Sequence, residues 1–183
     1  MNYQEIIDRF YPDENQLRTT LLTHSRLVAE KAVRIAECHY PELLEGGNTF
    51  LFDAAMLHDI VIVRCDAAGI SCYGTEPYIR HGMIGAEMLR DIDPSLEPYA
   101  RVCERHTGTG LRVDDIVRQQ LPLPHRDFVP ETLEEQIICY ADKFFSKTHP
   151  EEEKALERVE RSLERFGEAS LRQFRQWHEQ FGV

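Results

Sequence analysis

Residues 49–60 read TFLFDAAMLHDI, a short segment in which almost every side chain before His58 is apolar. A helix that is apolar on most sides is buried, so this segment predicts the central helix of the fold. It ends on His58 and Asp59, two polar residues that buried helices rarely carry. Because an unsatisfied buried polar group costs about 1 to 3 kcal/mol, this pair needs partners inside the protein.

On both sides of this segment, apolar residues recur every three or four positions, with little two-residue alternation. This period predicts a nearly all-helical chain without a sustained sheet. A capping box at Thr132 and Glu135 marks the start of one helix. The approximate helical ranges are 3–10, 14–38, 49–60, 79–91, 94–106, 113–120 and 132–145, with one apolar stripe in the charged tail 151–165.

Residues 61–78 combine glycine and proline without helical spacing. Long irregular segments in compact domains often form binding loops, so we expect substrate selectivity to lie there and around residues 108–112. The five cysteines form no CxxC pair and are expected to be free thiols, mostly in the core. Four histidines lack an apolar context and are expected at the surface: His39, His125, His149 and His178.

Length and charge limit the function classes. With 183 residues, 42% of them hydrophobic, the chain is expected to form one compact domain, with residues 1–148 as a metal-binding helical domain and 149–183 as a helical extension packed on it. A formal charge of -11 without a basic face argues against a nucleic-acid polymer as partner. No signal peptide or long apolar run is present, so a cytoplasmic protein without membrane contact is expected.

Six polar residues continue the apolar stripes of five predicted helices. A single histidine on such a stripe is most often a core residue with its own hydrogen bonds, but six would need six separate partners. One or two metal ions would satisfy all six together, and Asp59, beside His58, is the candidate bridging ligand. The residues are His24, His58, Asp59, His81, His106 and Asp142.

These residues, in this order, resemble the HD-domain superfamily of metal-dependent phosphohydrolases, over about two thirds of the chain. The resemblance implies an all-α, single-domain helical bundle, here with additional C-terminal helices. It also implies two metal ions: His24, His58, Asp59 and Asp142 hold the first, and His81 and His106 hold the second, with Asp59 bridging them. The two-metal, HDIG-like subgroup is the closest in pattern, although its members have glycine where Val61 stands. The motifs are His24, Leu57-His58-Asp59, His81-Gly82, Arg105-His106 and Ala141-Asp142-Lys143.

The chemistry of such a site suits hydrolysis. The positive charge of two divalent ions exceeds the negative charge of two aspartates, so the pocket attracts phosphate. Coordination also lowers the pKa of a bound water to about 7. A water nucleophile agrees with the lack of GxSxG, CxxC and P-loop motifs. Four imidazoles favour iron, manganese, zinc or another transition metal over magnesium, which prefers oxygen ligands. We expect iron or manganese, with zinc, nickel, cobalt or magnesium as alternatives. Lys143 and Arg105 adjoin proposed ligands, and Arg26 lies two residues after His24, so all three are candidate substrate contacts. Lys143 is also the candidate for protonating the leaving group.

The main functional prediction is therefore a metal-dependent phosphohydrolase that uses metal-bound hydroxide to cleave a small phosphate ester or nucleotide, with Asp59 and Lys143 as catalytic residues. Two alternatives stay open. The same ligand set resembles mixed-valence di-iron oxygenases of the HD type, and a helical pocket of this kind could also bind a nucleotide without turnover. The expected partner is a small phosphorylated substrate, and the sequence allows a homodimer.

Overall fold

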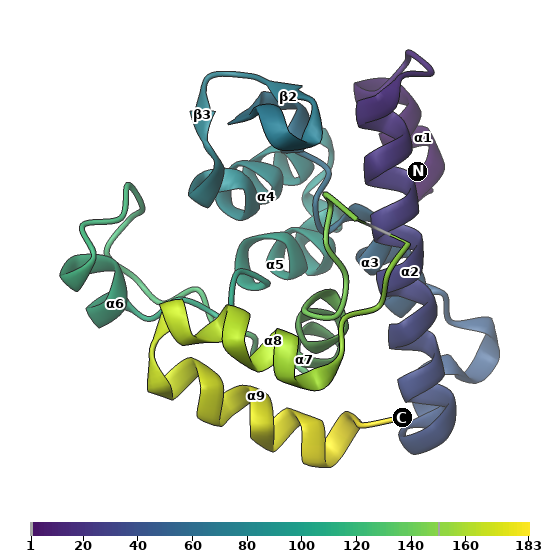
Figure 1. Cartoon of the computed structure of the whole chain (residues 1–183). Helices are drawn as coiled ribbons and strands as arrows, with labels where there is room; N and C mark the ends of the chain where they lie inside the picture. Colours follow the sequence, from purple (N-terminus) through teal and green to yellow (C-terminus); the bar gives the residue numbers. More distant parts are fainter. Residues whose placement is uncertain (1, 150) are drawn as a thin grey trace.

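The computed structural model describes residues 2–149 and 151–183, and helices make up most of this part of the chain (Figure 1). The all-α prediction is confirmed, and the predicted helical ranges agree with the observed ones to within a few residues at most ends. The α-helices are α1 (Tyr3–Phe10), α2 (Gln16–His39), α3 (Phe50–Leu57), α4 (His81–Ile92), α5 (Glu97–Arg105), α6 (Val113–Arg118), α7 (Leu133–Asp142), α8 (Leu156–Leu163) and α9 (Glu168–Phe181).

The core forms around α3, which packs against α2 and α5. Its apolar residues from Leu51 to Leu57 are almost all fully buried, as the apolar segment predicts. Leu21, Val28 and Ile35 on α2 are also fully buried, so the apolar residues that recur along this helix face the core. Helix α7 packs against both α2 and α5, so the helices that carry the polar residues of interest surround one centre.

Helix α3 ends three residues earlier than predicted. His58 caps the helix, and the chain continues in tight turns in which Ile60 N–H donates to Leu57 O at 3.0 Å and Ile62 N–H to Asp59 O at 3.1 Å. These three-residue hydrogen bonds replace the four-residue bonds of an α-helix. His58 and Asp59 therefore lie at the helix end rather than within the helix.

The prediction of an irregular loop at residues 61–78 is wrong, because this segment forms a small sheet with the strand order β2-β1-β3. Its strands are β1 (Cys65–Ala67), β2 (Cys72–Tyr73) and β3 (Glu76–Pro77), with β2 antiparallel and β3 parallel to β1. Gly74 closes the turn: its N–H donates to Cys65 O at 2.9 Å, and a Cβ there would lie 2.0 Å from Arg64 O. Strands of two or three residues cannot be recognised from the sequence, because alternation of apolar and polar residues shows only over longer segments.

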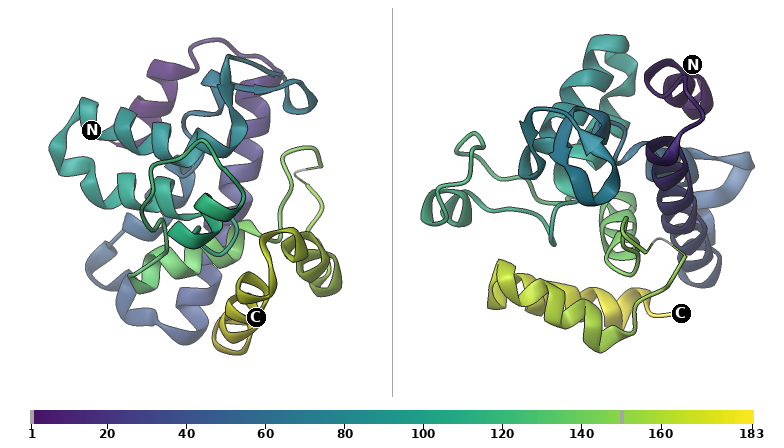
Figure 2. Two further views of the ribbon diagram at one scale, coloured as in Figure 1. Left: turned by 90° about the vertical axis from the view of Figure 1, so that its left-hand side faces the viewer. Right: turned by 45° about the horizontal axis from the view of Figure 1, so that its top comes forward.

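Helices α8 and α9 lie side by side along one face of the molecule (Figures 1 and 2). Helix α8 buries Val159 and Leu163, as the apolar stripe predicts. On α9, Phe174 stacks on Tyr140 of α7 with ring centroids 5.3 Å apart. The prediction that His178 is a surface residue is wrong, because it is partly buried and its Nδ1 lies 2.8 Å from the Tyr140 hydroxyl.

Two further features of the described residues bear on the predictions. All five cysteines are free, and four of them are buried, as expected. None of the helices seen in residues 2–149 and 151–183 combines the length and hydropathy needed to cross a lipid bilayer.

Candidate metal centre

Six buried side chains from five helices meet at the centre of the molecule. Five of them stand at or just beyond helix ends: His58 and Asp59 follow α3, His81 begins α4, His106 caps α5 and Asp142 ends α7, while His24 lies within α2. Helix ends can bring several side chains to one point because the chain turns away there instead of continuing through the site. The structure thus brings together every residue predicted as a metal ligand.

The first group consists of His24, His58, Asp59 and Asp142, whose ligand atoms all lie within 4.8 Å of one another. The Nε2 atoms of His24 and His58 are 3.2 Å apart. Asp59 Oδ2 lies 3.2 Å from the former and 2.9 Å from the latter. Asp142 Oδ1 lies 3.1 Å and 3.5 Å from the same two nitrogens.

The second group consists of Asp59, His81 and His106. The Nε2 atoms of the two histidines are 2.9 Å apart, and they lie 3.6 Å and 3.5 Å from Asp59 Oδ1. One carboxylate thus directs Oδ2 to the first group and Oδ1 to the second. This is the arrangement expected of a bridging ligand, and it fits the position predicted for Asp59.

Three imidazoles are oriented by the backbone. Nδ1 of His58 lies 2.6 Å from Ala55 O, Nδ1 of His81 lies 2.6 Å from Tyr78 O, and Nδ1 of His106 lies 2.7 Å from Cys103 O. A carbonyl oxygen only accepts, so Nδ1 of each ring carries a proton and Nε2 faces the cluster, where its lone pair is available in the neutral form of the ring. Such outer hydrogen bonds are typical of metal-ligating histidines.

The donor set fits one or two transition-metal ions. Ligand atoms about 2.1 Å from one ion lie about 3.0 to 3.4 Å from each other in octahedral or tetrahedral geometry. The nitrogen and oxygen separations in the two groups run from 2.9 to 3.6 Å. In addition, Asp59 Oδ1 is buried and accepts no directed hydrogen bond from the described residues, so a cation would satisfy it.

The electric field at the cluster favours cations. Burial lowers the pKa of His58, but the carboxylates of Asp59 and Asp142 outweigh burial and raise that pKa to about 9. Burial would raise the pKa of both aspartates, yet the neighbouring lysines and histidines hold both well below the usual value, so both stay ionised. Burial, and next the proximity of His106, lowers the pKa of His81 to about 3, which keeps its imidazole neutral. Two ionised carboxylates that face imidazole nitrogens form a typical cation site.

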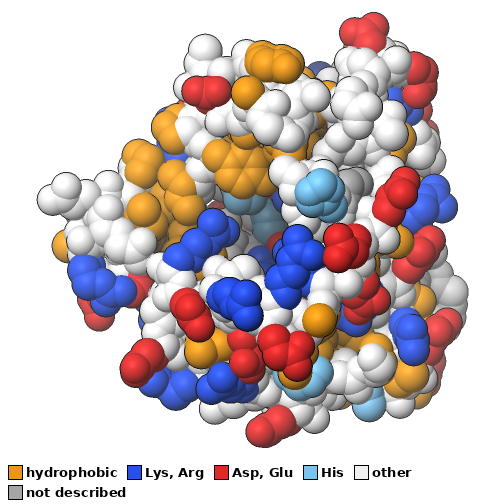
Figure 3. All heavy atoms as spheres, viewed as in Figure 1, with side chains coloured by type: hydrophobic (Ala, Val, Ile, Leu, Met, Phe, Trp, Pro, Cys, Tyr) orange, Lys and Arg blue, Asp and Glu red, His pale blue; other side chains and the backbone are white. Residues whose placement is uncertain are grey.

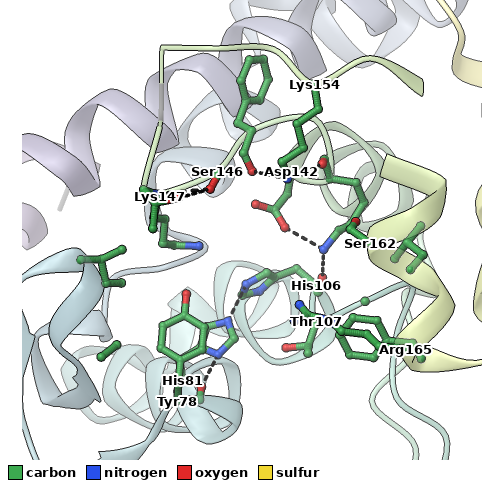
Figure 4. A pocket seen from close by; sticks show the side chains of 18 of the residues that line it. Tyr78, His81, His106, Thr107, Asp142, Ser146, Lys147, Lys154, Ser162 and Arg165 are labelled. Carbon is green, nitrogen blue, oxygen red and sulfur yellow. Dashed lines mark hydrogen bonds and ion pairs between the residues drawn. The ribbon is translucent and has the colours of Figure 1, made fainter. Parts of the chain in front are cut away.

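A pocket of about 440 Å³ opens beside the cluster, bordered by His81, His106 and Asp142. Figure 3 shows a hollow with histidine at its base, between a hydrophobic patch and several Lys and Arg side chains. Figure 4 shows His106 near the middle of this pocket, with Lys147 and Tyr78 to one side and Thr107 and Arg165 to the other. The volume lies in the range of small-molecule sites.

Residues 21–146 match the protein family described as HD domain. This chain belongs to the HD domain family. The His58-Asp59 pair at the end of α3 supplies ligand atoms to both groups of this HD domain.

Three relatives are similar to most of this chain. A tRNA (cytidine(56)-2'-O)-methyltransferase of Picrophilus torridus is 31% identical over 157 residues, which are 80% of this chain and 40% of that protein. An uncharacterized protein of Methanocaldococcus jannaschii is 36% identical over 135 residues, 74% of this chain and 72% of that protein. A tRNA (cytidine(56)-2'-O)-methyltransferase of Thermoplasma volcanium is 32% identical over 128 residues, 69% of this chain and 32% of that protein. The chain therefore spans less than half of both methyltransferases. No solved structure matches it significantly.

Two lysines after α7 reach the HD centre. Lys143 Nζ lies 2.7 Å from Asp142 Oδ2 and donates to His106 O at 2.8 Å, so its position beside the pocket agrees with the predicted role. Lys147 Nζ lies 2.5 Å from Asp59 Oδ2, and sequence reasoning missed it. Helical spacing could not reveal Lys147, because α7 ends at Asp142 and only the following turn directs the side chain inward.

The two predicted arginines lie elsewhere. Arg105 Nη1 lies 2.8 Å from Glu131 Oε2 and 3.6 Å from Glu135 Oε2, so its guanidinium is paired with these two carboxylates. Arg26 is exposed on α2. Neither borders the pocket beside the cluster, so the structure does not bring them together with the predicted ligands.

Proposed function

We propose that this protein is a metal-dependent phosphohydrolase of the two-metal, HDIG-like type, acting on a small phosphate ester or nucleotide. The observation that supports it best is the Asp59 carboxylate, whose two oxygens face two separate groups of histidines. Divalent ions bound there would lower the pKa of a coordinated water to about 7 and bind phosphate oxygens. Four of the six candidate ligands are imidazoles, which favour a transition metal over magnesium, and among the transition metals we favour iron or manganese.

The chain's own residues would bind and orient the substrate. Lys143 uses two contacts to fix its ammonium group, one with Asp142 and one with the His106 carbonyl, which leaves its third hydrogen for a phosphate oxygen or the leaving-group oxygen. Lys147 adds a second positive charge beside Asp59. His58, His81 and His106 keep their ring orientation through backbone hydrogen bonds and would not take part in proton transfer.

Metal-dependent release of phosphate tests this proposal. The purified protein, loaded with manganese or iron, is assayed on an aryl phosphate and on a panel of nucleotides and other phosphomonoesters. Asp59→Ala should abolish turnover, whereas Asp91→Ala, at an exposed position on α4, should not change it. A metal-loaded protein that is inert on the whole panel would contradict the proposal.

The ligand set also supports a second candidate. Four histidines and two carboxylates suit iron, so an oxygenase that uses two iron ions is an alternative reading of the same cluster. Oxygen uptake that depends on an added substrate, together with a mixed-valence resonance signal, would favour it. Tight nucleotide binding without turnover or oxygen uptake would instead indicate a binding module.

Two of the relatives are named as tRNA methyltransferases, so tRNA methylation is a further function to consider for this chain. Because the matching region is 40% and 32% of those proteins, we propose that it is a separate hydrolytic part of them, and that methyl transfer does not belong to the shared region. The formal charge of -11 also disfavours binding to a polyanionic tRNA. Incubation of this protein with tRNA and a labelled methyl donor should transfer no label, and transfer would contradict this assignment.

A further inference from the structure

The wall of the pocket beside the cluster is strongly basic. Among the residues that the structure describes, four cations and one carboxylate, Asp142, border it. Three of the cations follow the end of the HD segment at residue 146, so they belong to the C-terminal part of the chain. The cations are Lys143, Lys147, Lys154 and Arg165.

Three of these cations already have partners. Lys143 and Lys147 contact the carboxylates of Asp142 and Asp59. Lys154 Nζ donates to Lys143 O at 3.0 Å and to Phe145 O at 3.1 Å, which fixes the turn after α7. Arg165 differs, because it is exposed and forms no salt bridge with any described acidic residue.

Arg165 borders the pocket, and Phe166 links it to the loop after His106. Its guanidinium lies over the ring of its neighbour Phe166, 4.8 Å from the centroid. That ring packs against Gly108, where a Cβ would lie 3.3 Å from it. Gly108 has φ +62°, a conformation that side chains disfavour, so the close approach depends on glycine at this position.

We propose that the pocket binds a small molecule that carries a second anionic group besides the reacting phosphate, and that Arg165 contacts this second group. The proposal rests on the proposed phosphohydrolase function. Lys143 and Lys147 lie beside the cluster, where the reacting phosphate would bind, and Figure 4 shows Arg165 on the other side of His106 from Lys147. A guanidinium binds a phosphate or carboxylate through two parallel hydrogen bonds, so an unpartnered arginine here suits an anion.

The space between these basic ends is partly apolar. Ile70, Phe145, Leu163 and Phe166 border the pocket together with Tyr78. A carbon skeleton with an anion at each end fits such a wall better than inorganic diphosphate, which has no apolar part. The inferred substrate class is therefore a doubly anionic organic phosphate.

Binding of phosphonates tests this inference without turnover, because their phosphorus–carbon bond is not hydrolysed. Alkylphosphonates and the matching alkane diphosphonates, over a range of chain lengths, are titrated into metal-loaded protein by calorimetry. The best diphosphonate should bind about tenfold more tightly than its monophosphonate partner, the gain expected for one charge-assisted arginine contact. Arg165→Gln should remove this preference and Arg165→Lys should keep part of it.

Arg161→Gln is the matched control, since Arg161 is an exposed arginine on α8 that does not border the pocket. It should keep the full preference. Equal binding of both ligand types by the unmodified protein, or a preference that persists in Arg165→Gln, would overturn the inference. The outcome is separate from that of the proposed function: turnover of the aryl phosphate without a preference refutes only the inference, and a preference without any turnover refutes only the hydrolase.

Discussion

Lys147 Nζ lies 2.5 Å from Oδ2 of Asp59, and both side chains are almost entirely buried. This pair joins the turn after α7 to the end of α3, and it places a fixed positive charge on the carboxylate that faces both histidine groups. Burial lowers the pKa of Lys147, but Asp59 outweighs burial and raises that pKa well above the usual value, so the ammonium group stays charged. The lysine therefore contributes both to the stability of the centre and to its charge.

Lys147→Met should destabilise protein treated with a chelator by about 3 kcal/mol, because removing one partner of a buried ion pair leaves the other charge uncompensated. A transition metal should restore part of this loss, since the ion also compensates Asp59. Urea denaturation with and without metal measures both effects. Lys31→Met is the control: its partner Glu153 is 52% exposed, so a loss of about 1 kcal/mol or less is expected, without rescue by metal.

Gly82→Ala should remove the second metal while leaving the first. A Cβ at Gly82 would lie 2.5 Å from Cys103 O, so α4 would have to move away from α5 and His81 away from His106. Elemental analysis should show the metal content falling from about two towards one per chain. At Gly85, one turn further along α4, a Cβ would make only ordinary contacts from 3.5 Å, so Gly85→Ala should keep both metals. Equal metal content in the two variants would contradict this reading.

Metal removal should lower the stability of the whole domain. An ion that binds only the folded chain adds about 4 kcal/mol to the free energy of unfolding when its free concentration is a thousandfold above Kd. We expect protein purified without oxygen to contain about two transition-metal ions per chain and to melt at a lower temperature after chelation. An unchanged melting temperature, with metal loss verified by elemental analysis, would show that the cluster is satisfied without ions.

Glu104 should make stability depend on pH. Burial would raise its pKa, but hydrogen bonds from Arg90 and Arg126 outweigh burial and lower that pKa. A carboxylate whose pKa is lowered by folding stabilises the protein above its unfolded pKa of about 4.3 and loses this effect as the pH falls through the folded pKa.

Glu104→Gln should therefore lower the free energy of unfolding by about 2 kcal/mol at pH 7, and the difference from the unmodified protein should shrink in acid. Urea denaturation across this pH range measures it. Glu42→Gln, at an exposed position, should change little at any pH. A constant difference for Glu104→Gln from neutral to acidic pH would contradict the argument.

Much of the centre could be predicted because its ligands interrupt apolar stripes. His24 follows Leu21 on a buried face of α2, and such a position is costly for an imidazole unless something binds it. The same reasoning applied to His58, His81, His106 and Asp142, which the structure brings together. Sequence reasoning could group these residues because each lies within a predicted helix that has a clear apolar period, or at the end of one.

The features that could not be predicted from the sequence depend on contacts between distant segments, which periodicity does not reveal. Arg105 adjoins a ligand in sequence, yet it pairs with Glu131 and Glu135 because α7 packs on α5. Lys147 reaches Asp59, which is far away along the chain, through a turn without helical spacing. The strands in residues 65–77 are too short to show alternation of side chains, and their arrangement depends on the turn at Gly74.

The six candidate ligands are spread from His24 to Asp142, so no short stretch of the chain holds more than two of them. During synthesis on the ribosome, the first histidine emerges long before the last carboxylate. A nascent chain therefore cannot assemble the complete set until most of the protein has left the exit tunnel. If the cluster binds two ions as proposed, both sites become complete only after the chain has been synthesised as far as Asp142.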